Sequence, residues 1–239
     1  MLGRRVSSSQ PLPEFQSPPL IEVVLGVQFA PKPSLGTALA GLLWSRLREA
    51  YPHVEAQPPL PPVSPDENPT SPGITFGFMA GAASSPPLLF LGGGFWLLHH
   101  QPDRFVHNWR KNDGDSVYPR YGAVRASFEE GFEALQSFCA VEGLGEIEPT
   151  VCEVTYINHI VTGEEWEKVG DVGRVLKPVH FDAVVDAEPP SQFQLGFQRA
   201  ISRGGSPVGR LDVASQSVLR LADNKPMVLL TISAFGRPT

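Results

Sequence analysis

The chain has 239 residues, and at such a length about 70% of the unfolded surface can be buried without a disulfide or a metal to hold the core. The formal net charge of −6 argues against a protein that coats nucleic acid broadly, but it does not exclude a local basic face. The two cysteines, Cys139 and Cys152, are too few for a disulfide scaffold and are typical of a reducing compartment. We therefore expect a globular, cytoplasmic protein.

Residues 1–17 are expected to form a flexible N-terminal tail. Arg4 and Arg5 precede a run of serines rather than the apolar stretch of a secretory signal. The longest apolar run, residues 87–98, is interrupted by glycines and is shorter than a membrane span of about 20 residues. We expect no membrane segment, and a single domain over residues 18–239.

The first half of the domain, residues 18–145, begins with a β-branched stretch at 20–29 that prolines bracket and that predicts a strand. Leucines at helical spacing predict a helix over 35–51, with Ser34 as its N-cap. The proline-dense residues 57–72 predict an exposed, extended connection, either a plain loop or a PxxP site for a partner. The elements expected next are strands at 74–80 and 88–91, a β-hairpin at 94–112 and an amphipathic helix at 118–141.

The second half, residues 150–239, repeats the order of a strand, a helix and several strands. The pattern predicts a helix at 164–176 and strands at 151–161, 181–186, 193–201, 209–213, 217–221 and 227–235. Glu22-Val23 and Glu153-Val154 take similar places in the two opening strands, which suggests a duplicated strand-helix-strands unit with pseudo-halves 18–145 and 150–239. The fold class expected is α+β, a mainly antiparallel sheet with two or three packed helices.

The hairpin at 94–112 offers the most detailed geometry. With Pro102 and Asp103 as its turn, Gln101 pairs with Arg104, and strand alternation then sorts the side chains onto two faces. One face is expected in the core and carries Trp96, Leu98, His100, Phe105, His107 and Trp109. The other face is polar and cationic and carries His99, Gln101, Arg104, Asn108 and Arg110, with Val106 among them.

This polar hairpin face is the candidate binding site, because arginine forks bind phosphate and carboxylate groups bidentately and nearby tyrosines could add stacking rings. The candidate ligand- or partner-binding residues are Gln101, Arg104, Asn108, Arg110, Tyr118, Arg120 and Tyr121. The partner would be a protein or an anionic small ligand, since the negative charge and the absence of a recognised module disfavour nucleic acid. The alternative is a solvated outer face whose arginines meet nearby carboxylates. Replacing Arg104 and Arg110 is expected to leave folding intact.

Histidines support an enzymatic alternative. His100 and His107 lie on one face as a diagonal pair, and with Asp103 or a carboxylate of the second half they could hold a metal. No HExxH, CxxC or His-x-His motif supports that site, and the neighbouring aromatic residues favour packing. The acidic residues that could gather a cation, or form a solvated edge, are Asp182, Asp186 and Glu188. No nucleophile elbow or phosphate-binding loop is present in the sequence, so we assign no catalytic residue and no cofactor.

Several short motifs occur in an order that is found in a known family. They are Pro19-Leu20-Ile21-Glu22-Val23, Gln101-Pro102-Asp103-Arg104-Phe105, Asn108-Trp109-Arg110, Tyr118-Pro119-Arg120-Tyr121 and Tyr156-Ile157-Asn158. On these motifs the chain resembles a sporadically distributed, uncharacterised bacterial family of proteins of about this length. The resemblance implies a prokaryotic source and an accessory or defence-type role, and it carries no established activity or catalytic residue. It also implies a helical segment after the last strand, whereas this sequence stops at Thr239.

The leading expectation is a non-enzymatic binding or interaction protein of a bacterial accessory system, of a defence or toxin–antitoxin-like kind. The alternative is a metal-dependent hydrolase or nuclease that uses His100, His107 and a carboxylate. A sensor that binds a small molecule between the two halves is a third hypothesis, and a homodimer is compatible with each of them.

Overall fold

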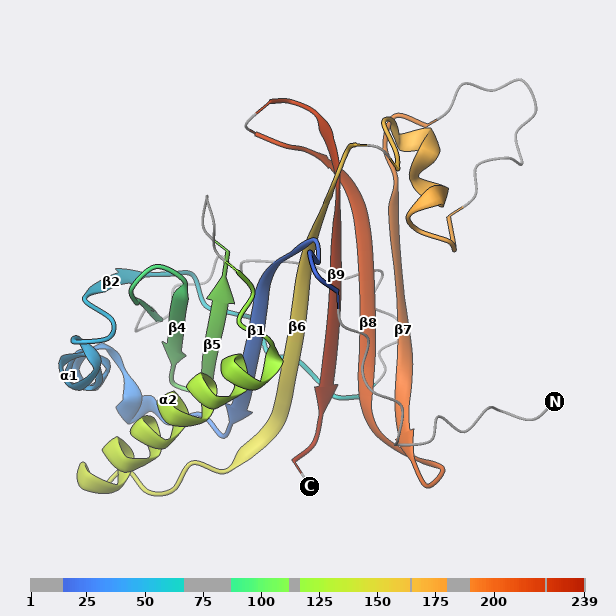
Figure 1. Ribbon diagram of the computed structural model, residues 1–239. Coiled ribbons are helices and arrows are strands. Elements are labelled where there is room, and N and C mark those ends of the chain that lie inside the picture. The colour runs from blue at the N-terminus through green and yellow to red at the C-terminus, as the bar shows by residue number, and fades with distance from the viewer. Residues whose placement is uncertain are drawn as a thin grey trace.

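The computed structural model describes residues 15–66, 87–111, 117–163, 165–179, 190–221 and 223–238. Within these ranges, nine strands form one antiparallel sheet in the order β2-β3-β4-β5-β1-β6-β9-β8-β7 (Figure 1). The strands are β1 Leu20–Phe29, β2 His53–Ala56, β3 Leu88–Leu91, β4 Trp96–Gln101, β5 Arg104–Arg110, β6 Pro149–Val161, β7 Gln194–Arg203, β8 Ser206–Leu219 and β9 Pro226–Gly236. The helices are α1 Thr37–Leu47 and α2 Tyr121–Val141, with the 3₁₀ helices η1 Pro33–Leu35 and η2 Val169–Arg174. An α+β protein with a mainly antiparallel sheet is thus confirmed.

Each half of the chain contributes a block of neighbouring strands to this sheet. In the first block, the chain leaves β1 and returns through β2, β3 and β4 to β5, which pairs with β1. In the second block, it leaves β6 and returns through β7 and β8 to β9, which pairs with β6. β1 and β6 pair with each other and join the blocks. The described part of the second half holds no α-helix, so the duplicated unit stays a prediction.

Some elements differ from those expected from the sequence. The helix expected at 164–176 is the 3₁₀ helix η2, in which Gly170 and Gly173 disfavour a regular α-helix. Residues 209–219, where the sequence pattern breaks into two short strands, are continuous in β8. The strands expected at 74–80 and 181–186 lie outside the described residues. As for membranes, none of the helices in the described ranges has the length and apolar character to span one.

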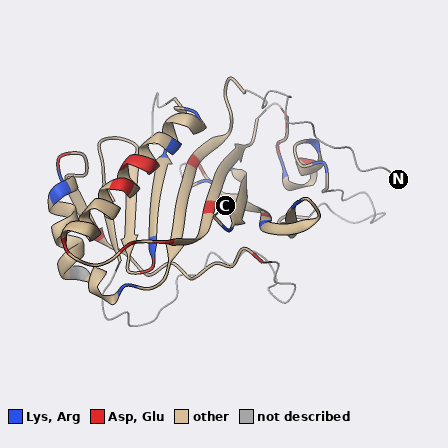
Figure 2. Ribbon diagram, turned by 90° about the horizontal axis from the view of Figure 1, so that it is seen from below, with Lys and Arg blue, Asp and Glu red and all other residues tan. Residues whose placement is uncertain are grey.

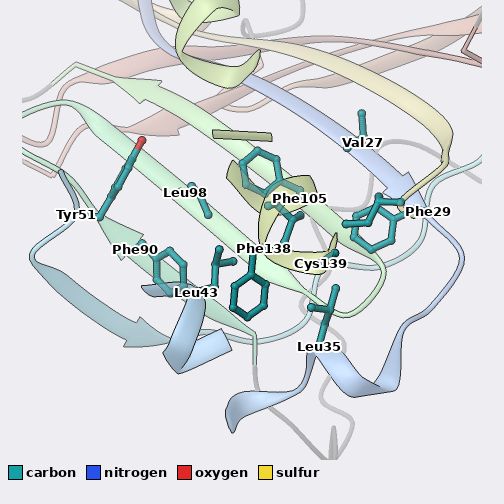
Figure 3. Close-up of a cluster of buried hydrophobic side chains, with 12 residues drawn as sticks. Val27, Phe29, Leu35, Leu43, Tyr51, Phe90, Leu98, Phe105, Phe138 and Cys139 are labelled. Atoms are coloured by element: carbon teal, nitrogen blue, oxygen red, sulfur yellow. The ribbon is translucent and has the colours of Figure 1, made fainter. Parts of the chain in front are cut away.

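The helix α2 crosses one face of the sheet, which we call the helix face and which includes Val23, Leu25 and Trp109 (Figure 1). Val124 of α2 is buried against these side chains. Gly131 allows a close approach to β5, because a Cβ there would lie 3.1 Å from Phe105 Cζ. A larger cluster joins α1, α2 and the hairpin (Figure 3) and comprises Val27, Phe29, Leu35, Leu43, Tyr51, Phe90, Leu98, Phe105, Leu135, Phe138, Cys139 and Ile147.

The hairpin of β4 and β5 has the register expected from its turn. Gln101 pairs with Arg104, and the pairs follow in step as far as Trp96 with Trp109. On the face expected in the core, every side chain is buried except that of Trp96, which is partly buried. Both the hairpin and its core face are therefore confirmed.

Residues 57–66, which we call the strap, cross the opposite face of the sheet, the strap face, which includes Gln28, Gln101 and Arg104 (Figure 1). The strap belongs to no strand or helix, as its prolines predict. It is only in part exposed, however, because Pro65 is buried and several other strap residues are partly buried against the sheet. The expectation of an exposed connection is therefore wrong for Pro65 and the partly buried strap residues and holds for Pro58, Pro62, Ser64 and Asp66, while 67–72 lie outside the described ranges.

Candidate binding surfaces

Gln101 and Arg104, at the turn end of the hairpin, lie beneath the strap. Arg104 is 3% exposed, and its Nη2 donates to the carbonyl oxygen of Pro61 at 2.8 Å and to the side-chain carbonyl of Gln28. The side-chain oxygen of Gln101 accepts the backbone N–H of Leu60 at 3.1 Å. The structure brings these two candidate residues together, and their polar groups bind the chain's own strap.

Asn108 and Arg110 lie further along the same strand and bind Glu22 of β1. Asn108 Nδ2 donates to Glu22 Oε1 at 2.6 Å, and Arg110 Nε donates to Glu22 Oε2 at 3.1 Å. The guanidinium of Arg110 remains about half exposed. The alternative hypothesis for the polar hairpin face was that its arginines pair with nearby carboxylates. The ion pair of Arg110 with Glu22 has that arrangement.

The remaining candidate residues, Tyr118, Arg120 and Tyr121, surround the start of α2. The Tyr118 ring packs on Trp109 with 5.3 Å between centroids, and burial raises the pKa of its phenol. Arg120 has a positive φ of 76° and donates to the carbonyl oxygen of Phe15 at 3.1 Å. Tyr121 is exposed beside the sheet. The seven candidate residues therefore fall into three places rather than one site.

The histidine pair of the metal hypothesis is buried in the core. His100 and His107 are 1% and 0% exposed, and a hydrogen bond of 2.6 Å joins His107 Nε2 to the hydroxyl of Tyr51. Burial lowers the pKa of each histidine to about 4, so both rings are neutral at pH 7. Among the described residues, no three His, Cys, Asp or Glu side chains are placed to hold a metal. The acidic residues at 182–188 lie outside the described ranges.

The helix face continues past α2 over β6, β9, β8 and β7. One rung across these four strands consists of Tyr156, Ile232, Val213 and Phe197. The neighbouring rung consists of Val154, Ala234, Leu211 and Arg199. The apolar side chains of the inner strands are partly buried, and Phe197 on β7 is 42% exposed. We call these two rungs the floor.

An open groove of about 380 Å³ lies beside α2, and of the floor residues only Val154 and Ala234 line it. Its lining includes Tyr121, Arg125 and Phe128 from α2, Cys152 from β6, and Ile201 and Arg203 from β7. Figure 2 shows acidic and basic residues together on α2, beside strands that are mainly uncharged. Arg125 pairs with Glu129 at 2.8 Å. Cys152 is exposed whereas Cys139 is buried. The groove therefore combines apolar and charged lining residues, and it adjoins the floor.

The sequence-based hypotheses missed this groove. The available signal was the alternation of Phe197, Arg199, Ile201 and Arg203 in β7, which places all four side chains on the helix face. Nothing local in the sequence shows that α2 covers the first block of strands and stops beside the second.

The fold is of the α+β class: one antiparallel sheet carries a helix over part of one face and a strap over the other. Comparison of the chain with models of known families, with curated proteins and with solved structures gives no match.

Proposed function

We propose that the chain is a non-enzymatic binding protein whose floor, together with the groove that adjoins it, takes an amphipathic helix of a partner protein. The observation that carries the proposal is the apolar part of the rung formed by Ile232, Val213 and Phe197, none of which belongs to a cluster with an α-helix among the described residues. Contiguous apolar surface of sufficient size is a feature of interaction sites. In keeping with the resemblance described above, we place this role in a bacterial accessory system.

The first block of strands supplies the argument for a helical occupant. There, α2 covers β1 and β5 on the same face of the sheet and buries Val124 among their side chains. In the second block, β6 and β9 take the places of β1 and β5. Four strands spaced about 4.8 Å apart offer a floor wide enough for a helix of about 10 Å diameter. A helix on this floor would pack as α2 does on the first block.

Charge indicates the character of the partner helix. Arg199 and Arg203 are exposed on β7, on the same face as the apolar Phe197 and Ile201. Asp or Glu residues beside the apolar stripe of a docked helix would meet these arginines, and such complementarity orients a complex. We therefore propose an acidic amphipathic helix.

A peptide of residues 121–141 is the probe, because it is this chain's own amphipathic helix and carries three glutamates and one arginine. In the peptide, Cys139 is replaced by Ala. A fluorophore attached to the exposed Cys152 of the protein reports occupation of the groove. We expect saturable binding with a Kd of about 10–100 µM. Phe197→Glu should weaken it at least about tenfold, since it places a charge on the apolar floor.

Ala200→Glu is the matched control, because it adds the same charge to the same strand on the opposite face. Its affinity for the peptide should equal that of the wild type. The absence of a saturable signal up to about 1 mM peptide, or an equal loss of affinity in both variants, would overturn the proposal.

A further inference from the structure

Two glutamines of the sheet bind the strap, each at a different strap residue. These two strap residues are three positions apart. Gln101 of β4 accepts the N–H of Leu60 at 3.1 Å, and its Nε2 lies 3.4 Å from the Leu60 carbonyl oxygen. Gln28 of β1 accepts the N–H of Val63 at 2.9 Å and donates to the Val63 carbonyl oxygen at 2.8 Å. Each side-chain amide therefore binds both main-chain polar groups of one strap residue.

This spacing matches one turn of a polyproline II helix. Three residues of that helix extend about 9.3 Å. β4 and β1 flank β5 and are therefore two strand spacings apart, about 9.6 Å. The prolines that favour this conformation by fixing φ are Pro58, Pro59, Pro61, Pro62 and Pro65. The sheet thus presents its two amides at the repeat of an extended, proline-rich chain.

The prolines between the two clamped residues set the register. Pro61 and Pro62 have no N–H, so a shift of the strap by one residue would leave a buried glutamine oxygen without its donor. Pro61 instead offers its carbonyl oxygen, which accepts from Arg104 at 2.8 Å. Gln28, Gln101 and Arg104 are all buried beneath the strap. The three side chains therefore select a segment of four residues. Its first and last residues have an N–H to donate, and its two middle residues are prolines.

An acidic residue anchors the downstream end of the strap. The carboxylate of Asp66 pairs with Arg237 of the C-terminal segment at 2.8 Å. The carbonyl oxygen of Asp66 accepts from Arg210 of β8 at 2.8 Å. Arg210 is itself buried and bound to Asp212 at 2.7 Å. An acidic residue three positions after Val63 therefore extends the recognised pattern to the second block of strands.

We propose that the strap face is a recognition surface for a proline-rich segment of a partner protein, and that the strap occupies it in cis as a competing pseudo-ligand. The anchoring contacts run from sheet side chains to the strap's main chain, so another chain of the same pattern makes the same ones. The tether gives the strap an effective concentration in the millimolar range, so a free segment competes only when the strap is released. The strap face lies on the other side of the sheet from the floor, although Arg237, which pairs with Asp66, also lines the groove.

The probe is a fluorescein-labelled peptide of residues 57–66, and fluorescence anisotropy measures its binding. In the released variant, residues 58–65 of the full chain are replaced by Gly and Ser at equal length, with proline at positions 60 and 63 so that neither glutamine is offered an N–H. Circular dichroism and cooperative unfolding check its fold. We expect no binding to the wild type up to about 1 mM, and a Kd of about 10–100 µM for the released variant. Adding Gln28→Ala and Gln101→Ala to it should weaken binding at least about tenfold.

A second variant covers the case in which the released variant does not fold. Leu60→Pro with Val63→Pro in the full chain removes only the two clamped N–H groups and should also admit the probe. A matched peptide with proline at both positions should not bind any of these proteins. A folded released variant that binds no better than the wild type, or equal binding of both peptides, would overturn the proposal. A wild-type dimer in native mass spectrometry that Leu60→Pro with Val63→Pro abolishes would assign the surface to a second copy and overturn the assignment to a partner protein.

Discussion

Two arginines on the same face of β5 have different surroundings. Arg104 is buried and binds neutral acceptors, the amide of Gln28 and the carbonyl oxygen of Pro61. Arg110 is about half exposed and pairs with Glu22. Removing the buried Arg104 donor takes a hydrogen bond from the Pro61 carbonyl oxygen and one of two from the Gln28 side-chain oxygen, which keeps the Val63 N–H. An ion pair near solvent, by contrast, contributes little to stability. The difference in burial therefore sets apart what the two arginines contribute.

Replacing these arginines separately tests that difference. We expect Arg104→Ala to lower the free energy of unfolding by about 2–3 kcal/mol, because Gln28 and Pro61 lose a shared donor in a buried place. Arg110→Ala should lower it by less than about 1 kcal/mol. Urea denaturation followed by circular dichroism measures both. This expectation replaces the one from the sequence, that both changes leave folding intact, and equal losses would contradict it.

At the scale of elements, β8 and β9 approach closely where Gly209 faces Gly236. A Cβ on Gly209 would lie 2.2 Å from the carbonyl oxygen of Phe235, a main-chain atom held in the ladder between the two strands. Gly41, within α1, would meet nothing within 4 Å. Replacing glycine by alanine therefore strains the β8–β9 pair at Gly209, whereas α1 accommodates the same change at Gly41.

We expect Gly209→Ala to lower the free energy of unfolding by about 1–3 kcal/mol, because the strands must shift to admit the methyl group. Gly41→Ala should raise it by about 0.5–1 kcal/mol, since alanine loses less backbone entropy in a helix interior. Thermal unfolding of both variants measures the two effects. A Gly209→Ala variant as stable as the wild type would show that the two strands do not need this close approach.

At the scale of the whole molecule, folding buries three neutral histidines. His99, His100 and His107 each have a pKa lowered to about 4, chiefly because burial disfavours the charged ring. An unfolded histidine has a pKa of about 6.5. Between these values the unfolded chain binds more protons than the folded one, so stability rises with pH across this window and falls as the solution is acidified.

We expect acidification from pH 7.5 to 5 to lower the free energy of unfolding by about 2 kcal/mol for each of these histidines. His100→Leu should remove one such contribution, and the exposed His53→Leu provides the control substitution. Urea denaturation at the two pH values measures the difference. An unchanged acid sensitivity in His100→Leu would contradict the assignment of this ring as a buried neutral group.

The hairpin shows how far local patterns carry. The Pro102-Asp103 turn and the alternation around it were sufficient for the register and for the buried face, because the paired residues are close in the chain. The same reasoning could not predict which polar side chains remain free to bind a ligand or partner and which bind another part of the chain. Arg104 meets Pro61, which is 43 residues away in the sequence. The register of the hairpin was therefore predicted, whereas the contacts that its polar side chains make were not.

By itself, the sequence determined the class of fold, the order of most strands and helices, and the two faces of the hairpin, because periodicity and turn chemistry act over a few residues. Only the tertiary structure decided that the strap covers the polar face and that α2 leaves an apolar groove over the second block of strands. Both depend on contacts between segments far apart in the chain, which compete for the same sheet and leave no local pattern.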